Sequence, residues 1–375
     1  MKKGMLILIV MNVWLLTGCW DVRLLKDNSL VVGIGLDVED DDKIMNTSVI
    51  RQIKQDSGGT GKPATANVIY SAAGNTLRET RTYIEKQLGG KYASNKMQVL
   101  MLGEDLAGED ILPIIDVFYR DPRNSLGAKL VVAEGTAKEL LNMKMSEDVF
   151  ISEKIFKALI ETEEQTLIPG VSIQSVCPDL FDPGIDFALP YIKTKNSDTF
   201  DVAGMALFHD TSFTGTVLEG EDGTVLLYLN GEHGASSTLS FNVNPEEEQR
   251  QNQFITTNAF LKDQKLKVKV DKSHNVSVEI NVKLNVTVVE YPKDHLFDHE
   301  KELKLNKEIS KQLTEKAEKV IEQLQKANCD YFGIGRELMA YHPETWKEID
   351  WPNTFPTIDI KPNIEVEITG TGILK

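Results

Sequence analysis

Cys19 is the residue of this sequence whose surroundings point most directly to a chemistry. It follows a positive segment with Lys2 and Lys3 and then an apolar run at residues 5–16, in which Asn12 is the single polar member. That run of roughly 12 residues fits the apolar core of a signal peptide, which has about 7–15 residues. It is shorter than the ~20 apolar residues of a permanent transmembrane helix. The pattern therefore predicts export of the chain rather than a stable membrane span.

The residues just before Cys19 favour attachment of a lipid. Leu16, Thr17 and Gly18 followed by cysteine resemble the bacterial lipobox, in which the thiol is alkylated with diacylglycerol before cleavage. An ordinary signal peptide that ends near a cysteine is the alternative. Two acyl chains make a stable anchor, whereas one chain binds only marginally. We therefore predict that residues 1–18 are removed and that diacylglyceryl Cys19 holds the mature chain at the outer face of the membrane.

The remaining cysteines and the histidines predict no metal site. Cys177 and Cys329 could form a disulfide in an oxidising exterior, or both could be free and buried. His295 and His299 are four residues apart amid three acidic residues, which favours a solvated charged turn over a zinc site. We expect neither a metal nor a cofactor.

No stretch of the sequence carries a complete catalytic motif. Gly33 and Gly35 lack the third glycine and the following helix of a dinucleotide-binding turn. The glycine-rich segment at residues 58–62 is followed by Pro63, where a P-loop needs Ser or Thr. A Gly-x-Ser-x-Gly nucleophile turn is also absent. We therefore expect a protein that is not an enzyme.

The charge of the chain limits its partners. Its 375 residues are 41% hydrophobic and 26% charged, and the net charge is −16. Removal of Lys2 and Lys3 makes the mature chain still more acidic. So acidic a chain repels phosphodiester backbones and anionic lipid head groups. Nucleic acid is therefore excluded as a partner, and the membrane must be held by the anchor alone.

The first half of the chain alternates predicted strands and helices. Period-two alternation and short apolar runs predict strands, and apolar residues three and four apart predict helices. The strands lie at residues 32–38, 45–53, 97–102 and 129–133, and the helices at 76–88, 105–119, 136–143 and 152–163. Thr136 is a candidate N-cap. Residues 176–200 contain several prolines and aspartates and are expected to connect two domains, with the main boundary near residue 198.

The second half predicts a smaller set of longer elements. Residues 201–217 suggest two short strands about a turn, and strict alternation predicts a long antiparallel hairpin around residues 272–275. Residues 300–327 predict one long helix with an apolar stripe that packs on that sheet rather than on a partner helix, and a strand follows near the end. The expected fold is α+β (mixed α/β), with an N-terminal domain at 19–198, possibly of two subdomains, and a C-terminal domain at 199–375.

Five stretches, taken in order, resemble the Ger(x)C family, the lipoprotein C subunits of bacterial spore germinant receptors. They are GCWD at 18–21 with Arg23, VVGIGLD at 31–37, KMQVLMLGEDLAGEDILPIIDVFYRDPR at 96–123, AGMALFHDTSFTGTV at 203–217, and DYFGIGRELMAYHPETWKEIDW at 330–351. The last stretch contains Asp330, Gly333, Gly335, Pro343, Trp346 and Trp351 in the order typical of the family. Arg123 and Asn124 depart from the family, which often has an acidic residue there.

The resemblance implies a non-enzymatic receptor subunit of three α/β domains. Family members act with two polytopic proteins, the A and B subunits, in the inner membrane of the dormant spore, where nutrients trigger germination. We expect docking on these partners through Arg120, Asp121, Trp346 and Trp351, although tryptophans are often core residues and an Arg-Asp pair often ends a helix. The alternative function is a lipid-anchored solute-binding protein that captures a small ligand directly.

Overall fold

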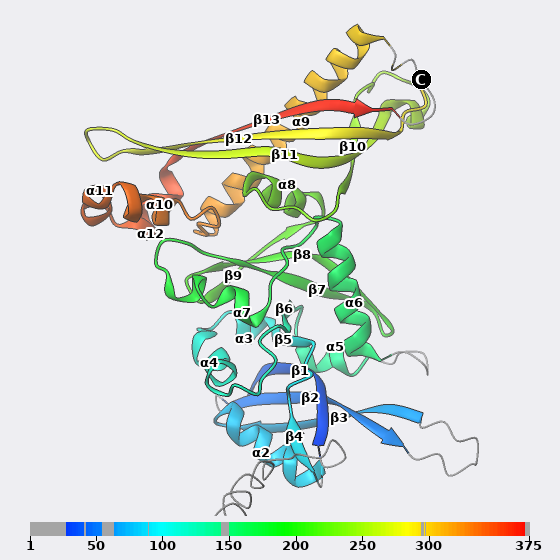
Figure 1. Cartoon of the computed structure of the whole chain (residues 1–375), viewed down its shortest axis with the longest axis vertical. Helices are drawn as coiled ribbons and strands as arrows, with labels where there is room; N and C mark the ends of the chain where they lie inside the picture. Colours follow the sequence, from blue (N-terminus) through cyan, green and yellow to red (C-terminus); the bar gives the residue numbers. More distant parts are fainter. Residues whose placement is uncertain are drawn as a thin grey trace, which may run out of the picture.

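The computed structural model describes residues 28–40, 43–54, 64–88, 90–143, 150–293, 296 and 298–371. Cys19, the predicted signal peptide at 1–18 and His295 lie outside this part of the chain. Figure 1 shows a larger sheet in the lower and middle part of the molecule and a smaller sheet in the upper part, with short helices between them. The mixed α+β fold expected from the sequence is confirmed.

The larger sheet has nine strands and a parallel centre. Its strands are β1 (Asn28–Glu39), β2 (Lys43–Lys54), β3 (Ala64–Gly74), β4 (Lys91–Ala93), β5 (Val99–Gly103), β6 (Lys129–Ala133), β7 (Ala188–Asn196), β8 (Thr199–His209) and β9 (Ser212–Glu219). The order is β3-β2-β1-β5-β6-β7-β8-β9, with β4 beside β1. The pairs β1–β5, β5–β6 and β6–β7 are parallel, and antiparallel hairpins extend both sides.

Helices cover both faces of the larger sheet, so its central strands are apolar on both sides. In β5, Val99 and Met101 point into one core, and Leu100 and Leu102 into the other. One face carries α5 (Ala137–Leu141) and α6 (Ile151–Glu164). The other carries α2 (Leu77–Leu88), α3 (Glu104–Ala107), α4 (Leu112–Arg120) and α7 (Ile173–Val176). The strands and helices predicted for this half are present, with Thr136 accepting a hydrogen bond from the N–H of Glu139 at 3.2 Å.

Two expectations for this half were wrong in detail. The single helix predicted at 105–119 is two helices, because α3 ends at Gly108 and α4 begins afresh with Pro113 in its first turn. Proline fits a helix start, where its missing N–H is not needed. The connecting segment expected at 176–200 contains strand β7 of the larger sheet. The domain boundary near residue 198 stays a prediction; it lies in the turn between β7 and β8, which pair antiparallel.

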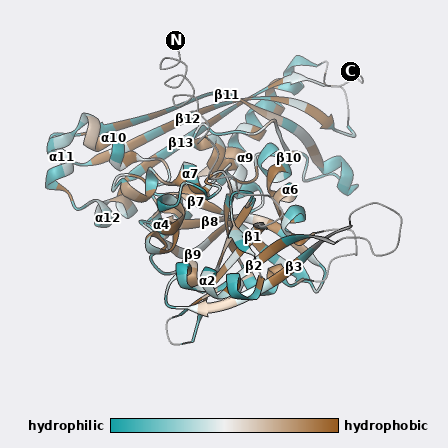
Figure 2. Cartoon of the chain, turned by 60° about the horizontal axis from the view of Figure 1, so that its bottom comes forward, coloured by the Kyte–Doolittle hydropathy of each residue, from teal (hydrophilic) through white to brown (hydrophobic). Residues whose placement is uncertain are grey.

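The smaller sheet contains the predicted long hairpin. Its strands are β10 (Ser237–Asn242), β11 (Phe254–Val270), β12 (Val276–Glu290) and β13 (Asp359–Gly370), in the order β10-β11-β12-β13. The hairpin of β11 and β12 turns at residues 271–275, as expected, and β13 runs parallel to β12. Figure 2 shows hydrophilic and hydrophobic residues alternating along these strands, which gives the sheet one wet face and one buried face.

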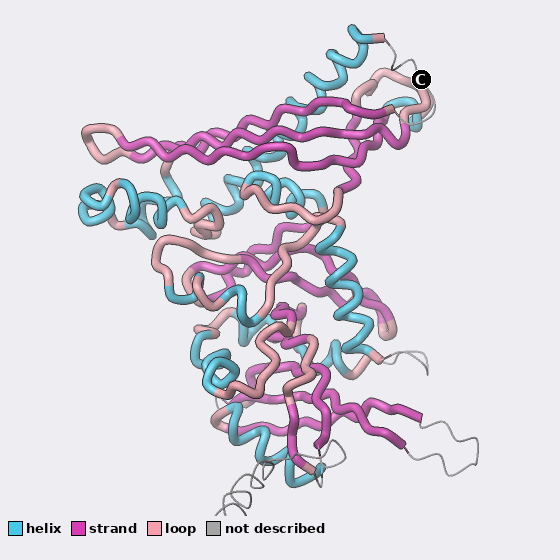
Figure 3. Tube along the Cα trace, viewed as in Figure 1, coloured by secondary structure: helices cyan, strands magenta, loops and turns pink. Residues whose placement is uncertain are grey.

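The predicted long helix is α9 (His299–Lys326), and its apolar stripe is core, as expected. The buried residues of the stripe are Leu305, Ile309, Leu313, Ala317, Val320, Ile321 and Leu324. Figure 3 shows α9 passing obliquely behind the smaller sheet. Short helices not identified from the sequence fill the space between the two sheets: α8 (Glu221–Leu229), α10 (Ile334–Tyr341), α11 (Pro343–Glu348) and α12 (Trp351–Thr354).

A second row on α9 is polar and covers the edge of β13. Thr314, Ser310 and Asn306 accept hydrogen bonds from the backbone N–H groups of residues 364, 366 and 368 at 3.1, 2.9 and 2.9 Å. Four residues of helix rise about 6 Å and two residues of strand about 6.6 Å, so the two rows stay in step. The helix thus hydrogen-bonds the edge as a neighbouring strand would.

Candidate functional site

Arg120 and Asp121 occupy the end of α4 but do not pair with each other. The Arg120 side chain is 78% exposed and forms an ion pair with Asp116 at 2.6 Å. Asp121 is the residue that follows the helix, and it accepts hydrogen bonds from the backbone N–H and the guanidinium of Arg123. The Arg123 guanidinium lowers the pKa of Asp121 to about 2. Arg120 is therefore available at the surface, whereas Asp121 orders its own turn.

Trp346 and Trp351 lie next to each other beneath the smaller sheet. Their ring centroids are 6.1 Å apart, and the ring of Trp351 also contacts Phe355 at 5.7 Å. Trp351 is only 6% exposed, while Trp346 is half-buried. The tryptophans are in a different part of the molecule from Arg120 and Asp121 (Figure 1). The four residues expected to form a docking surface therefore lie in two separate places.

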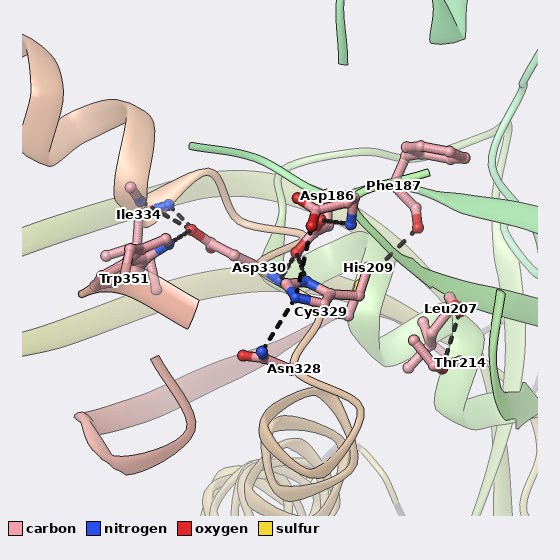
Figure 4. A network of polar contacts seen from close by, with 12 residues as sticks. Asp186, Phe187, Leu207, His209, Thr214, Asn328, Cys329, Asp330, Ile334 and Trp351 are labelled. Atoms are coloured by element: carbon pink, nitrogen blue, oxygen red, sulfur yellow. Dashed lines mark hydrogen bonds and ion pairs between the residues drawn. The ribbon is translucent and has the colours of Figure 1, made fainter. Parts of the chain in front are cut away.

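A polar cluster joins the two sheets at Asp186 and Asp330. Asp186 lies just before β7, and Asp330 lies between α9 and α10. The N–H of Asp186 donates to the carbonyl of Asp330 at 3.0 Å, and the N–H of Asp330 donates to the Asp186 carboxylate at 2.8 Å. Figure 4 shows this reciprocal pair between the loop before β7 and the segment that follows α9. We call Asp186, His209, Asn328, Asp330 and Trp351 the aspartate clasp.

Asp330 is the centre of the clasp, and its carboxylate accepts three hydrogen bonds. It accepts the N–H groups of Ile334 and Gly335 at 3.0 and 2.8 Å and the indole N–H of Trp351 at 3.1 Å. Burial raises the pKa of Asp330 to about 7, against these donors, which favour the charged form. Gly335 is required here because a Cβ would lie 2.7 Å from the Trp351 nitrogen and 2.9 Å from the Cα of Gly184.

The larger sheet contributes Asp186 and His209 to the clasp. Asp186 also accepts the N–H of Asp210 at 2.7 Å, and His209 Nδ1 lies 3.3 Å from its other oxygen. His209 Nε2 in turn lies 3.2 Å from the side-chain nitrogen of Asn328, which ends α9 in the left-handed region at φ 54°. The hydrogen bond with Asp186 raises the pKa of His209.

The clasp suits a structural joint better than a catalytic centre. Asp186, His209 and Asp210 offer ligand atoms within 4.8 Å of one another, which is the geometry a metal would need. However, both oxygens of Asp186 already accept backbone N–H groups. The cavity beside the clasp has a volume of about 20 Å³, room for about one water molecule. A substrate does not fit there.

A second polar centre lies at the opposite end of the parallel strands. Asp37, at the end of the VVGIGLD stretch, accepts the N–H groups of Ala137 and Lys138 at 2.6 and 3.0 Å and so holds the start of α5. Burial raises the pKa of Asp37. A Cβ on Gly103 would lie 2.1 Å from an Asp37 oxygen, so glycine is required at that position.

Two adjoining depressions lie between the sheets in the described part of the chain. The first, of about 470 Å³, has Glu163, Glu164 and Glu232 among its lining residues. The second, of about 220 Å³, shares Glu232 and reaches Asp186.

Cys177 and Cys329 are both free thiols, and burial raises the pKa of Cys329. The disulfide left open by the sequence is therefore not formed.

Comparison with known families identifies the family of this chain. The N-terminal domain of spore germination proteins matches residues 21–194, and the "Spore germination B3/ GerAC like, C-terminal" family matches residues 203–372. The chain belongs to the GerAC family of spore germination proteins. The resemblance of the sequence to the Ger(x)C family is confirmed. Among the described residues no helix is long and apolar enough to cross a membrane.

Several GerAC relatives match nearly end to end. Spore germination protein GerQC of Bacillus cereus is 24% identical over 100% of this chain and 99% of its own length. Spore germination protein KC of Bacillus subtilis is 23% identical over 98% and 95%. Putative spore germination protein YfkR of Bacillus subtilis is 29% identical, but over only 52% of each chain. The crystal structure of the GerBC protein has the same fold, with a TM-score of 0.55, 18% identity and coverage of 93% of this chain and 100% of that one.

The structure gives physical roles to residues of the DYFGIGRELMAYHPETWKEIDW stretch that the sequence alone did not give. Asp330 and Trp351 belong to one half of the clasp, where the N–H of Gly335 donates to Asp330, and Asp186 and His209 form the other half. Asp186 was missed because it stood in a segment expected to be a linker. The sequence offered one indication of its place: Asp186 lies between two prolines and just before an apolar run. Such a run is as compatible with a strand as with a loop.

Proposed function

We propose that this chain is a non-enzymatic, lipid-anchored subunit of a spore germinant receptor, acting with two polytopic membrane subunits in nutrient-triggered germination. The observation that carries the proposal is the match of both halves of the chain to GerAC spore germination families, in order and almost without a gap. Diacylglyceryl Cys19 attaches the chain to the outer face of the spore inner membrane. The folded domains present docking surfaces to the A and B subunits.

The structure supports a role in binding rather than catalysis. The buried carboxylates of Asp186 and Asp330 are occupied by backbone donors, and the space beside them holds about one water. A general acid or base must instead reach a substrate within hydrogen-bonding distance. The exposed guanidinium of Arg120, on a helix end, has the freedom to meet a partner carboxylate.

Substitution of Arg120 tests the docking part of the proposal. Arg120→Ala removes an exposed guanidinium and one surface ion pair, which costs the fold less than about 1 kcal/mol. We expect nutrient-triggered germination to slow by roughly tenfold at a normal level of the protein. Arg78→Ala, at another exposed helical arginine, is the matched control and should leave germination unchanged. Normal germination in both variants would remove Arg120 from the docking surface.

Direct capture of a small ligand is the second candidate function, favoured by the depression of about 470 Å³ between the sheets. Ligand sites commonly have volumes of about 300–1,000 Å³. Its acidic lining with Glu163 and Glu232 would suit an amine. The two sheets, however, differ in size and topology, unlike the two similar lobes of a solute-binding protein. Calorimetry of the full chain with amino acids and sugars separates the candidates, since tight binding by the chain alone would favour capture.

A further inference from the structure

The two edges of the smaller sheet differ in how far their backbone groups are hydrogen-bonded. The β13 edge is hydrogen-bonded by the polar row of α9, at Asn306, Ser310 and Thr314. On the other side, β10 pairs with β11 only from Phe254 to Ala259. In the described part of the chain no strand continues that pairing over residues 260–270. We call this stretch the open edge.

The open edge is held in an extended, ready-formed conformation. Residues 260–270 pair with β12 throughout on one side, with a bulge between Leu261 and Asp263. Gln264 donates to the carbonyl of Leu229 beneath the sheet at 2.7 Å. At the hairpin tip, His274 Nδ1 lies 2.8 Å from the hydroxyl of Thr345 on α11. Figure 3 shows the hairpin extending beyond β10 to reach these helices.

The sequence of the open edge has two different faces and a local charge opposite to that of the whole chain. Residues 260–270 read FLKDQKLKVKV, with four lysines and one aspartate, or a local charge of +3 in a chain of −16. Lys265, Lys267 and Lys269 are exposed on the wet face, where Lys265 pairs with Asp263 at 3.2 Å and Lys269 pairs with Glu279. Leu266, Val268 and Val270 alternate with them on the inner face and are only partly buried. A strand added here would meet lysines on one side and aliphatic side chains on the other.

We propose that the open edge is a docking site for an extended segment of a partner subunit, which joins the smaller sheet as a strand beside β11. The partner segment alternates acidic and apolar residues. Its backbone pairs with the outward N–H and C=O groups of residues 260–270, since alternate residues of an antiparallel strand point away from their existing neighbour. The identity of the partner as a receptor subunit rests on the proposed function.

Charge excludes a second copy of this chain as the occupant. Pairing of two open edges would place Lys265, Lys267 and Lys269 of one copy opposite lysines of the other, and like charges directly opposite destabilise a strand pair. Lysines on a free edge also discourage such self-association. An acidic segment has neither difficulty, because Lys267 then gains an opposite charge, and Lys265 and Lys269, which pair with Asp263 and Glu279, gain a second one.

Photo-crosslinking in membranes that contain the full chain and its two multi-span subunits tests the proposal. A photoreactive residue at position 267 should crosslink to one of those subunits, and the same residue at Asn363, on the wet face of the protected β13, should not. Amide hydrogen exchange of residues 260–270 should slow in the complex, while that of residues 364–368 should not change. Crosslinking from other surface positions without any from 267 would overturn the open-edge proposal and leave the proposed function standing.

Charge reversal adds a second readout with a matched control. Lys265→Glu with Lys267→Glu should lower the recovery of the partner subunits with the chain roughly tenfold. Lys361→Glu, an equally exposed lysine at the other side of the same wet face, should leave recovery unchanged. Equal recovery for the two charge-reversal variants would overturn the proposal. Failure to recover either multi-span subunit with the wild-type chain would overturn the proposal and the proposed function together.

Discussion

At the scale of single residues, Asp330 is a buried carboxylate that also connects the two sheets. A carboxylate taken out of water is costly unless donors replace the lost water, and here two backbone N–H groups and one indole do so. Through the reciprocal pair with Asp186, the same residue connects the segment after α9 to the strand β7 of the other sheet. The stability of the whole joint therefore depends on one side chain.

Removal of the Asp330 side chain should lower the free energy of unfolding strongly. Asp330→Ala leaves the N–H groups of Ile334 and Gly335 and the indole of Trp351 without acceptors, at about 1–3 kcal/mol for each buried donor. We expect the free energy of unfolding to fall by at least about 3 kcal/mol in urea titrations. Asp359→Ala, whose exposed carboxylate pairs with Lys361, should change it by less than about 1 kcal/mol. A loss at position 330 no larger than that control would contradict the role of the clasp.

The clasp also predicts a pH dependence with a definite sign. Burial raises the pKa of Asp330 from 3.8 to about 7, so the folded chain holds a proton that the unfolded chain has released between these values. Stability should therefore fall as the pH rises through that window, by at most about 4 kcal/mol. His209, with a pKa raised by Asp186, acts in the same direction, because its contribution is lost above its folded pKa.

The comparison of wild type with Asp330→Asn isolates this effect from the general charge of −16. Urea midpoints at pH 5 and pH 8 should differ more for the wild type than for the variant. Asp186, Asp210 and Cys329 face the same site and remain in both proteins. An identical pH response in the two proteins would show that Asp330 stays charged throughout, held so by its three donors.

At the scale of elements, α9 combines two sequence patterns of which only one was recognised. The apolar stripe from Leu305 to Leu324 has the familiar spacing of three and four residues, and it predicted the helix and its buried face. The row Asn306, Ser310 and Thr314 also repeats every four residues, but polar side chains on a helix are usually solvated. Its meaning came only from the strand edge that the fold places beside it.

Removal of this polar row should expose the β13 edge. The triple variant Asn306→Ala, Ser310→Ala and Thr314→Ala should lose about 1 kcal/mol for each hydrogen bond. Its amides at residues 364, 366 and 368 should exchange faster, and the chain should self-associate with rising concentration. Lys311→Ala, at an exposed position on the same helix, is the control. Unchanged exchange at those three amides would show that α9 protects the edge only by packing.

Local pattern was sufficient for most elements and insufficient for those that tertiary contacts create. The β11–β12 hairpin and α9 were predicted because their periodicity is long and uninterrupted. Helix α8 was missed since it is buried on all sides and has no polar face. The clasp could not be foreseen, because Asp186 and Asp330 are 144 residues apart and only the packing of two sheets brings them together.

At the scale of the whole molecule, attachment through Cys19 remains a prediction. Cys19→Ala removes the thiol that would receive diacylglycerol, and the part of the chain that the structure describes has no helix long and apolar enough to span a membrane. We expect the variant to leave the membrane fraction and nutrient-triggered germination to fall sharply, since a tethered subunit meets its partners at a much higher effective concentration. Cys177→Ala, at a free cysteine, is the control. A Cys19→Ala protein that stayed with the membrane would contradict the anchor.

The parallel pairing of β12 with β13 also sets the order in which the strands of the smaller sheet can pair during folding. Their paired residues are about eighty positions apart, and the whole of α9 and the clasp segment lie between them. Contacts of such long range form slowly, because the intervening chain must be in place first. During export, therefore, the hairpin emerges with the β12 edge and the open edge of β11 bare for some time, because β10, which precedes it in the chain, covers only residues 254–259. The lysines at its open side would then serve the newborn protein as well as the finished one, by discouraging contact with its own copies.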